Sequence, residues 1–292
     1  MHLISSPMES SAGSALVRIR DLVYRVAGIF QPDNRLNFLQ ERCSRRMKAV
    51  GVPSLRGYLE RLTAHPDREL ELRQLLNEIT VGETCFFRNQ PQIEAVRRVV
   101  LPCLLEAKKI LPFRNLRIWS AGCSTGEEPY TLAILLLEES LGMLKNCKTE
   151  VIATDLNDRS LARAQAGVYG QYALRNVSPA ILQKYFTPLG DQFQLCDEVK
   201  AKVTFRQLNL LDDSKMVFMK AIDVIFCCNV LIYFDGASKR RVIQHFLNNV
   251  NPGGYFFLGY SESLFGVNDD FRLVHFPGST GYHKPTRNGL VK

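Results

Sequence analysis

Two glutamates beside a glycine-containing turn are the residues of this sequence best suited to bind a charged ligand. The run RIWSAGCSTGEEPY (117–130) reads as a strand, a turn through Gly122 and Gly126, and a helix that opens with Glu127 and Glu128. Small residues in such a turn let a ligand approach the backbone at the carboxyl end of a strand, where open α/β sheets bind ligands. Each part also has a purely structural interpretation, because tight turns need glycine and acidic side chains stabilise the start of a helix.

The charge of the two glutamates discriminates between ligands. A dinucleotide fold places pyrophosphate at this helix N-terminus, and two carboxylates there would repel it. A ligand with positive charge and hydroxyl donors suits them better. S-adenosylmethionine carries a sulfonium, an ammonium and ribose hydroxyls, so the pair favours this cofactor. An NAD-dependent oxidoreductase is the least favoured alternative.

Asp155 stands at the end of a second strand, in the run VIATD (151–155). A carboxylate at that place can accept hydrogen bonds from both hydroxyls of a ribose. Its distance in sequence from Gly122 exceeds the roughly 20 residues of the dinucleotide fingerprint, which again argues against NAD. The structural alternative is that Asp155 or Asn157 caps the helix expected from residue 158, and both roles can hold together.

A third strand and its polar loop, DVIFCCNVLIYFD (223–235), carry further candidates. The loop leaves the sheet at the same end as the other two strands, and from there Asn229 and Tyr233 could reach the ligand. Asp235 is placed to cap the following helix. Tyr233 could equally be an aromatic residue of the core.

Arg88 closes the run NEITVGETCFFR (77–88), directly before the helix expected over 89–109. An arginine in this position could lie over the ligand cleft. The alternative is a surface arginine beside two packing phenylalanines, and spacing alone leaves both interpretations open.

These candidates require a sheet whose strands end at one edge, and the sequence from Pro112 onward provides it. Strand-like runs alternate there with helical runs, which is typical of a doubly wound α/β sheet. Residues 168–202 interrupt the alternation and indicate an insertion with a helix at 179–186 and short strands. We expect strands at 116–121, 150–154, 203–207, 223–228 and 255–260, helices near 126–142, 158–167 and 236–249, and an edge hairpin at 271–284.

The first part of the chain reads as helical and contains no convincing strand. Helices are expected over 35–50, where Gly51 and Pro53 end the helix, and then over 54–62 and 67–77. We therefore divide the chain into a disordered leader (1–14), an N-terminal helical domain (15–90), a linker helix (91–111) and an α/β domain that binds the cofactor (112–292).

Composition excludes several classes of protein. With 292 residues, 46% hydrophobic and 23% charged, the chain can bury a core, and no apolar run reaches the roughly 20 residues of a membrane span. The start of the chain lacks the apolar segment of a secretory signal. Eight scattered cysteines form no C-x-x-C pair or zinc-ligand spacing, which is typical of reduced thiols in a cytoplasmic protein without a metal. The net charge of +8 favours an acidic partner, either a protein surface or nucleic acid.

The segments 77–88, 117–130 and 223–235 together resemble CheR-type chemoreceptor methyltransferases, which esterify receptor glutamates with S-adenosylmethionine. The resemblance covers residues 15 to 285. It implies a class I S-adenosylmethionine-dependent methyltransferase with a Rossmann-like doubly wound sheet, a small inserted β subdomain and an N-terminal all-α domain. It also implies a cytoplasmic enzyme of chemotaxis signalling that releases S-adenosylhomocysteine. Nothing in the sequence requires more than a monomer.

The resemblance assigns residues as well. It implies that Arg88 and Tyr233 shape the methyl-transfer site. Two positions depart from the family pattern, because Gly82 stands where many members have asparagine and Cys228 where arginine commonly precedes Asn229. The backbone at Cys228 can still contribute to binding. With Gly122 added from the turn itself, the expected cofactor contacts are Thr84, Arg88, Gly122, Glu128, Asp155, Asn209, Leu210, Cys228 and Asn229.

Methyl transfer to a glutamate needs no general base. A glutamate carboxylate has an ordinary pKa of about 4.3, so it is already ionised at pH 7. Attack on a sulfonium methyl is an in-line displacement in which the opposite charges cancel, and the enzyme's main task is alignment and desolvation. We expect Tyr233 to orient the glutamate oxygen and Arg88 to organise the cleft.

The helix expected over 35–50 is a candidate docking surface for an acidic helical segment of a receptor. Its basic residues are Arg42, Arg45, Arg46 and Lys48, and a solvated amphipathic face is the alternative interpretation. Some members of the family also bind a receptor's C-terminal peptide through a glycine-rich extension of the β subdomain. The corresponding stretch here, 187–197, is short and contains only Gly190, so we expect no dependence on such a tether.

Two other functions remain open at this point. A nucleic-acid methyltransferase would share the cofactor site and suit a basic chain. However, residues 229–234 read NVLIYF and lack the NPPY type of segment used by amino-group methylases of bases. A non-catalytic module that binds S-adenosylmethionine and signals through its helical domain would retain binding without forming an ester.

Overall fold

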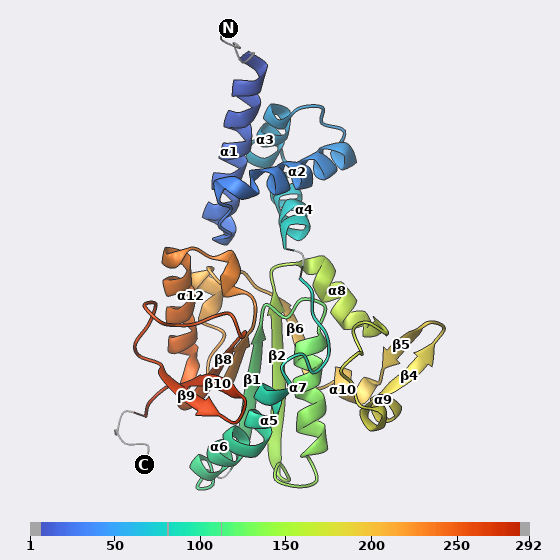
Figure 1. The fold of residues 1–292 in the computed structure, drawn as a ribbon, viewed down its shortest axis with the longest axis vertical. Helices are drawn as coiled ribbons and strands as arrows, with labels where there is room; N and C mark the ends of the chain where they lie inside the picture. The colour runs from blue at the N-terminus through green and yellow to red at the C-terminus, as the bar shows by residue number, and fades with distance from the viewer. Residues whose placement is uncertain (1–6, 81, 112, 287–292) are drawn as a thin grey trace. The chain divides into compact units, whose positions relative to one another are not determined.

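The computed structural model describes residues 7–80, 82–111 and 113–286, with the backbone alone for residues 7–12. The chain forms two compact units (Figure 1). One comprises residues 1–81 together with Tyr233–Asp235, and the other comprises Gly82–Ile232 and Gly236–Lys292. The first unit is helical, and the second carries the strands.

The helices of the first unit begin and end where local sequence signals place them. Gly51 ends α2 in the left-handed conformation, with φ +69°, and its N–H donates to the carbonyl of Met47. The hydroxyl of Ser54 accepts the N–H of Gly57 at 3.2 Å and so caps α3. The helices predicted over 35–50, 54–62 and 67–77 are confirmed as α2 (Leu36–Val50), α3 (Leu55–Thr63) and α4 (Arg68–Ile79), preceded by α1 (Pro7–Ala27) and the short η1 (Asp33–Arg35).

Helix α1 begins earlier than the sequence indicated. Residues 7–14, expected in a disordered leader, form its first turns, and residues 1–6 lie outside the described residues. A buried stripe of Leu16, Ile19 and Val23, spaced by three and four residues, holds the helix in place. The small and polar residues before this stripe concealed the start of the helix, although Pro7 suits a first turn.

The second unit is built around a mostly parallel seven-stranded sheet in the order β6-β2-β1-β7-β8-β10-β9. Neighbouring strands are parallel from β6 through β8, whereas β10 is antiparallel to both β8 and β9. The predicted parallel strands and edge hairpin are confirmed. Their bounds are β1 (Arg114–Ala121), β2 (Cys147–Asp155), β6 (Val203–Gln207), β7 (Ile222–Cys227), β8 (Val250–Leu258), β9 (Arg272–Phe276) and β10 (Ser279–His283). We call the end at which the parallel strands finish the carboxyl edge.

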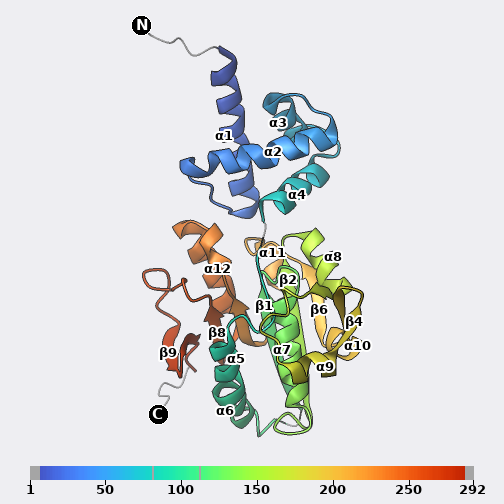
Figure 2. The ribbon, with the colours of Figure 1, turned by 45° about the vertical axis from the view of Figure 1, so that its right-hand side comes forward.

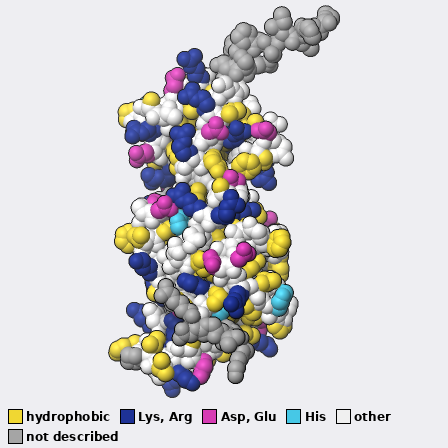
Figure 3. Space-filling model, turned by 90° about the vertical axis from the view of Figure 1, so that its left-hand side faces the viewer, with side chains coloured by type: hydrophobic (Ala, Val, Ile, Leu, Met, Phe, Trp, Pro, Cys, Tyr) yellow, Lys and Arg dark blue, Asp and Glu magenta, His cyan; other side chains and the backbone are white. Residues whose placement is uncertain are grey.

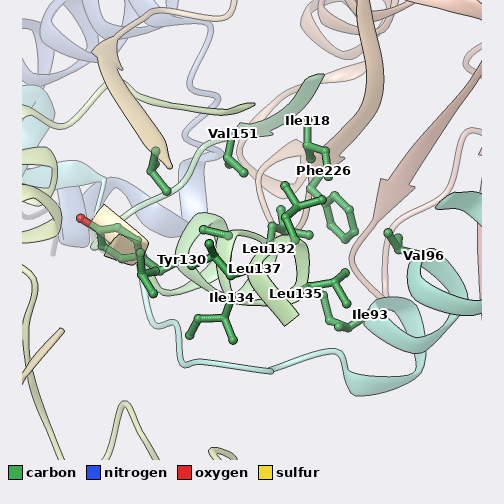
Figure 4. Packing of buried hydrophobic residues seen from close by; sticks show 14 of the residues in the cluster. Ile93, Val96, Ile118, Tyr130, Leu132, Ile134, Leu135, Leu137, Val151 and Phe226 are labelled. Carbon is green, nitrogen blue, oxygen red and sulfur yellow. The ribbon is translucent and has the colours of Figure 1, made fainter. Parts of the chain in front are cut away.

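Alternate residues of β1 face two different layers of helices. Trp119 packs edge-on against Phe246 of α12 (Gly236–Asn249), with ring centroids 5.1 Å apart. Its neighbour Ile118 belongs to the opposite core, where Leu132 of α7 (Glu127–Glu138) lies close to it (Figure 4). Helix α8 (Asp158–Ala166) follows β2. The predicted doubly wound arrangement is therefore present, with helices on both faces of the sheet.

The segment before β1 belongs to the α/β unit. The helix predicted over 89–109 is present as α5 (Gln90–Ala95), a single π-helical stretch (Val96–Val100) and α6 (Leu101–Ala107). Figure 4 shows Ile93 of α5 and Leu135 of α7 pointing toward one another. Phe86 is fully buried 4.8 Å from the ring of Tyr169, so the α/β unit begins at residue 82 and the helical domain does not extend to residue 90.

The insertion forms a separate three-stranded antiparallel sheet in the order β3-β5-β4, next to α9 and α10 (Figure 2). A tight turn at Gly190, with φ +61°, joins β4 to β5. The elements are β3 (Val168–Gly170), α9 (Pro179–Tyr185), β4 (Phe186–Leu189), β5 (Gln192–Leu195) and α10 (Asp197–Lys200), and the short α11 (Asp213–Met216) and η3 (Leu231–Tyr233) follow. Within the described residues, no helix combines the length and apolar character needed to span a membrane.

Candidate active site

The turn after β1 leaves the sheet beside the end of β2. The N–H groups of Gly122 and Cys123 both donate to the carbonyl of Thr154, at 2.8 and 2.9 Å. Gly122 has φ +80°, and a Cβ there would lie 2.3 Å from Val230 Cγ2. Glycine is therefore required by backbone conformation and by the closeness of the loop after β7. The turn and this loop form adjoining walls at the carboxyl edge.

Asp155 fixes the turn from the neighbouring strand. Its Oδ2 accepts the N–H of Ser124 at 2.7 Å, and its Oδ1 accepts the N–H of Asn157 at 2.8 Å. The helix α8 is capped instead by Asn157, whose side-chain oxygen accepts the N–H of Ser160. Burial raises the pKa of Asp155, while its bonds with backbone N–H groups oppose that rise. Each carboxylate oxygen has a second lone pair, so Asp155 can still accept from a ligand hydroxyl.

The two glutamates at the start of α7 make hydrogen bonds to different segments. Glu128 is half-buried, and its Oε1 accepts the hydroxyl proton of Ser120 at 2.6 Å. The nearby Cys228 thiol donates to Gln92 Oε1 at 3.9 Å. Glu127 is buried and accepts from the hydroxyl of Thr125 at 2.7 Å. The charge argument from the sequence treated both as ligand groups, but only Glu128 is bonded to a residue of β1 near the carboxyl edge.

Burial gives Glu128 unusual proton chemistry. It raises the pKa of this carboxyl to about 6, against the opposing effects of the bond from Ser120 and of the positive charge of Arg88. Burial likewise raises the pKa of the Cys228 thiol well above its ordinary value, so this cysteine is a neutral thiol that can donate to Gln92. A cationic ligand would favour the ionised form of Glu128.

The end of β7 contains a residue in an unusual backbone conformation. Asn229 has φ +61°, and its N–H donates to Glu262 Oε2 at 2.6 Å. Glu262 was not identified from the sequence, although it follows β8 as Asp155 ends β2. The signal that could have revealed it is an acidic residue just after the strand expected at 255–260.

Asn209 and Leu210 lie in the loop after β6, beside the end of β2. The N–H of Leu208 donates to the carbonyl of Asp155 at 3.0 Å, which joins this loop to the second strand. The side-chain oxygen of Asn209 accepts the N–H of Leu211, and the carbonyl of Leu210 bonds to His245 Nδ1. The loop thus has a defined conformation next to Asp155.

The segment 82–88 is attached to the α/β unit on two sides. The N–H of Phe86 donates to the carbonyl of Ala173, and the N–H of Phe87 to the hydroxyl of Thr131 at 3.0 Å. A Cβ on Gly82 would lie 2.9 Å from Ser124 Oγ, so Gly82 stands directly over the turn after β1. A larger residue at position 82 would require the Ser124 hydroxyl to turn away.

The two phenylalanines carry the expected packing role, and the arginine after them is at the surface. Arg88 is exposed and donates from Nη1 to the carbonyl of Glu83 at 2.8 Å. Thr84 is half-buried in the same segment. The structure thus brings Gly122, Glu128, Asp155 and the ends of the remaining parallel strands to one edge, with the segment 82–88 alongside.

Tyr233 belongs to the helical unit, together with the two residues that follow it. Its carbonyl accepts the N–H of Phe30 at 2.8 Å, and Phe234 pairs with Ile29. The carboxylate of Asp235 accepts the hydroxyl proton of Tyr24 at 2.9 Å. Tyr233 is half-buried, so it is not one of the core aromatic residues.

The basic residues of α2 divide between surface and interior. Arg46 donates two hydrogen bonds to Glu71, at 3.0 and 2.7 Å, and the hydroxyl of Tyr58 donates to the same carboxylate. Arg46 is 13% exposed and Glu71 only 4%, so this arginine belongs to the interior of the helical unit and not to a docking surface. The reason is its position three residues after the buried Cys43, on the same helix face.

The other basic residues of α2 are accessible to different extents. Arg45 is 55% exposed beside Glu41, and Lys48 is exposed. Arg42 is half-buried and lies 4.6 Å over the ring of Phe38. On the face shown in Figure 3, Lys and Arg side chains are interspersed with Asp and Glu. Arg45 and Lys48 are therefore the members of the predicted docking set that are most available to a partner.

Comparison with known proteins identifies the family. The model for "CheR methyltransferase, SAM binding domain" matches residues 82–279, and that for "CheR methyltransferase, all-alpha domain" matches residues 14–80. Chemotaxis protein methyltransferase 2 of Vibrio cholerae is 37% identical over 92% of each chain. A probable chemotaxis protein methyltransferase of Rhizobium etli is 34% identical over 84% of this chain and 91% of its own. Chemotaxis protein methyltransferase 1 of Pseudomonas aeruginosa is 34% identical over 91% of this chain and 96% of its own.

The fold and the carboxyl edge define an α/β methyltransferase that uses S-adenosylmethionine. The chain belongs to the CheR methyltransferase family and carries both of its domains in order. The resemblance stated from three sequence segments and the predicted fold class are confirmed. The residues present also fit this cofactor, because Asp155 has acceptor capacity for ribose hydroxyls and Glu128 offers negative charge to a cationic ligand.

Proposed function

We propose that this protein transfers the methyl group of S-adenosylmethionine to glutamate side chains in the cytoplasmic helices of a chemoreceptor. The products are glutamyl methyl esters and S-adenosylhomocysteine. The observation that carries the proposal is the carboxyl edge of the sheet in a chain with both CheR domains. There Asp155 ends β2, and Glu128 in the first turn of α7 is bonded to Ser120 of β1. Such a site suits a cofactor that combines positive charge with ribose hydroxyls.

Each side of the carboxyl edge has a part in holding the cofactor. Asp155 accepts from the ribose hydroxyls, and Glu128 provides negative charge for the cationic groups. Bound in this way, S-adenosylmethionine supplies a methyl group on a positively charged sulfur. The full set that we assign to cofactor binding is Thr84, Arg88, Gly122, Glu128, Asp155, Asn209, Leu210, Cys228 and Asn229, with Cys228 contributing through its backbone.

The acceptor requires orientation more than activation. A glutamate with a pKa near 4.3 is ionised at neutral pH, so no residue of the chain has to remove a proton from it. We assign Tyr233 to orienting the acceptor oxygen through its hydroxyl and Arg88 to organising the cleft. We propose a reaction without metal, because the acceptor carboxylate is already ionised and the leaving sulfonium is already activated.

Arg45, Lys48 and the half-buried Arg42 are our proposed docking residues for acidic receptor helices. Their exposure and positive charge support this role, whereas Arg46 is already bound to Glu71. We further propose binding without a receptor tether, because the β4–β5 turn is short and contains Gly190 alone of the glycines. We also propose that the protein is a cytoplasmic monomer that does not bind nucleic acid. The eight free cysteines support only the reducing compartment.

The decisive experiment combines the purified protein, S-adenosylmethionine labelled in the methyl group, and membranes that contain chemoreceptors. Mild base should release the label from the receptor as methanol, because a carboxyl methyl ester is labile to base. A matched Tyr233→Phe variant should bind S-adenosylhomocysteine normally and lose most of its turnover. Full turnover by this variant would remove Tyr233 from the proposal.

Other outcomes identify the competing functions. Cofactor binding without any receptor label would favour a non-catalytic binding module. Base-stable label in added DNA or RNA would favour a nucleic-acid methyltransferase. Absence of cofactor binding in calorimetry would contradict the assignment of the carboxyl edge.

A further inference from the structure

Glu262 joins the ends of two neighbouring strands at the carboxyl edge. β7 and β8 run in parallel with Cys227 opposite Leu258, so Asn229 and Gly259 lie just beyond the paired residues. The N–H groups of these two residues both donate to Glu262 Oε2, at 2.6 Å from Asn229 and 2.9 Å from Gly259. One carboxylate oxygen thus satisfies two backbone donors from different strand ends.

The packing around this carboxylate is close enough to exclude a side chain at position 259. A Cβ on Gly259 would lie 2.8 Å from Glu262 Oε2 and 3.0 Å from the backbone nitrogen of Asn229. The N–H of Glu262 donates back to the carbonyl of Gly259 at 3.0 Å and closes the turn between them. Glycine at 259 and glutamate at 262 therefore form one arrangement.

Asn229 adopts a conformation that its surroundings must hold. Its φ of +61° lies in the left-handed region, which residues other than glycine adopt rarely. Such a conformation persists where neighbouring groups fix it. The short bond from the Asn229 N–H to Glu262 does so directly.

Among the described residues, only one of the two carboxylate oxygens of Glu262 has hydrogen-bond partners. Its second oxygen, Oε1, is buried and has no hydrogen-bond partner within the described part of the chain. An unsatisfied buried carboxylate oxygen carries a desolvation cost, so a residue that only filled this space would not need to be a carboxylate. The two backbone bonds made by Oε2 explain why a carboxylate stands here.

We propose that Glu262 is a positioning residue of the cofactor site, which fixes Asn229 in its left-handed conformation and so sets how the loop after β7 faces the cofactor. The inference rests on the proposed function, because the contact between Asn229 and the cofactor is part of it. Glu262 acts through Asn229 and does not itself have to touch the cofactor.

The test is a double-mutant cycle on the binding of S-adenosylhomocysteine to the full chain, measured by calorimetry. Glu262→Ala and Asn229→Ala should each weaken binding by about tenfold, the loss expected for one charge-assisted or cofactor hydrogen bond. The double variant should bind no more weakly than the weaker single variant, because both changes remove the same contact. Glu262→Gln should remain within about threefold, because its amide oxygen can replace Oε2. Ser261→Ala, at an exposed neighbouring position, is the matched control.

A spectroscopic measurement tests the two bonds from Asn229 and Gly259 to Glu262 without any cofactor. In Glu262→Ala the amide-proton resonances of Asn229 and Gly259 should both move upfield, and in Glu262→Gln they should move much less. If Glu262→Ala does not fold, Glu262→Asp replaces it, because the shorter side chain cannot reach both amides.

The outcomes separate this inference from the function on which it rests. Additive effects in the cycle, or unchanged amide resonances in Glu262→Ala, would overturn the positioning role. If Asn229→Ala binds normally while Asp155→Asn does not, the cofactor site stands and only the Asn229 contact fails, which also refutes the inference. If every variant, Asp155→Asn included, binds S-adenosylhomocysteine as tightly as the unaltered protein does, the cofactor site itself is contradicted.

Discussion

The carboxyl edge of the α/β unit and helix α2 of the helical unit both carry charges that suggest a function, but they hold them differently. At the edge, Asp155 and Glu262 each accept two backbone N–H groups, so the fold itself fixes both carboxylates. On α2, Arg45 is exposed while Arg46 is buried against Glu71. A carboxylate fixed by hydrogen bonds from backbone N–H groups is a stronger indication of a binding site than a charged residue on a helix. Charged residues on a helix can also lie in the interior, as Arg46 does.

The largest effect that would test this comparison concerns Arg46. Arg46→Ala should lower the free energy of unfolding by about 3 kcal/mol, because it leaves the buried carboxylate of Glu71 without its cation. Arg45→Ala should change the same quantity by less than about 0.5 kcal/mol, because that arginine is exposed. Urea unfolding followed by circular dichroism measures both. Equal effects would mean that the two arginines do not differ in role.

The next effect concerns Asp155. Asp155→Asn should weaken binding of S-adenosylhomocysteine by about tenfold to a hundredfold, because one carboxylate oxygen becomes an amide donor that faces a backbone N–H. Asp197→Asn is a matched control, since the side chain of Asp197 is 95% exposed on the inserted subdomain. Normal cofactor binding by Asp155→Asn would show that the turn after β1 does not need this carboxylate.

A smaller effect should follow pH through Glu128. Burial raises its pKa to about 6, so it is ionised at pH 7 and largely protonated at pH 5. Affinity for S-adenosylmethionine should therefore fall by up to about tenfold between pH 7 and pH 5, as the negative charge is lost. Calorimetry across this range measures the change, and Glu128→Gln should show little of it. An equal pH dependence in the variant would assign the titration to another group.

Without cofactor, the same raised pKa makes the free energy of unfolding depend on pH in the opposite direction to cofactor affinity. Between the unfolded value near 4.5 and the folded value near 6, the folded chain binds more protons than the unfolded chain at Glu128. Its contribution to the free energy of unfolding is therefore largest at acid pH and is lost as pH rises through about 6. Acid should thus favour folding at this residue while it weakens cofactor binding.

The smallest effect concerns the accessible part of α2. Arg45→Glu combined with Lys48→Glu should raise the KM for receptor methylation by about threefold to tenfold, because the docking charge is reversed at an exposed site. Affinity for S-adenosylhomocysteine and the melting temperature should stay unchanged. A steady-state methylation assay at low ionic strength measures the first, and no change in KM would leave α2 as a solvated face.

The sequence predicted the sheet well because its strands are short apolar runs that end in turn residues. It also identified Gly122 and Asp155, since the carboxyl ends of parallel strands meet at one edge. The charge argument alone did not separate Glu127 from Glu128, and only the resemblance singled out Glu128. The reason is that adjacent residues on a helix point in different directions, and tertiary packing decides which of them faces the site. Glu262 was missed for a similar reason, since its partners are backbone groups that lack a sequence signature.

Two further differences between the sequence interpretation and the structure also arise from long-range packing. Arg46 lies on the stripe of Leu39 and Cys43, so helical periodicity already indicated an inward direction, but its charge suggested the surface. Phe86 was placed in the helical domain by its position before the linker helix, whereas its burial against the inserted subdomain puts it in the α/β unit. In both cases long-range packing decided what local pattern left open.

The assignment of Tyr233–Asp235 to the helical unit has a consequence for protein engineering. A chimera that exchanges this unit between two relatives at residue 81 alone would leave the backbone pairing of Ile29 and Phe30 facing a foreign loop. A functional exchange should therefore transplant residues 233–235 along with the helices, which makes the module discontinuous in the gene although it is compact in the protein.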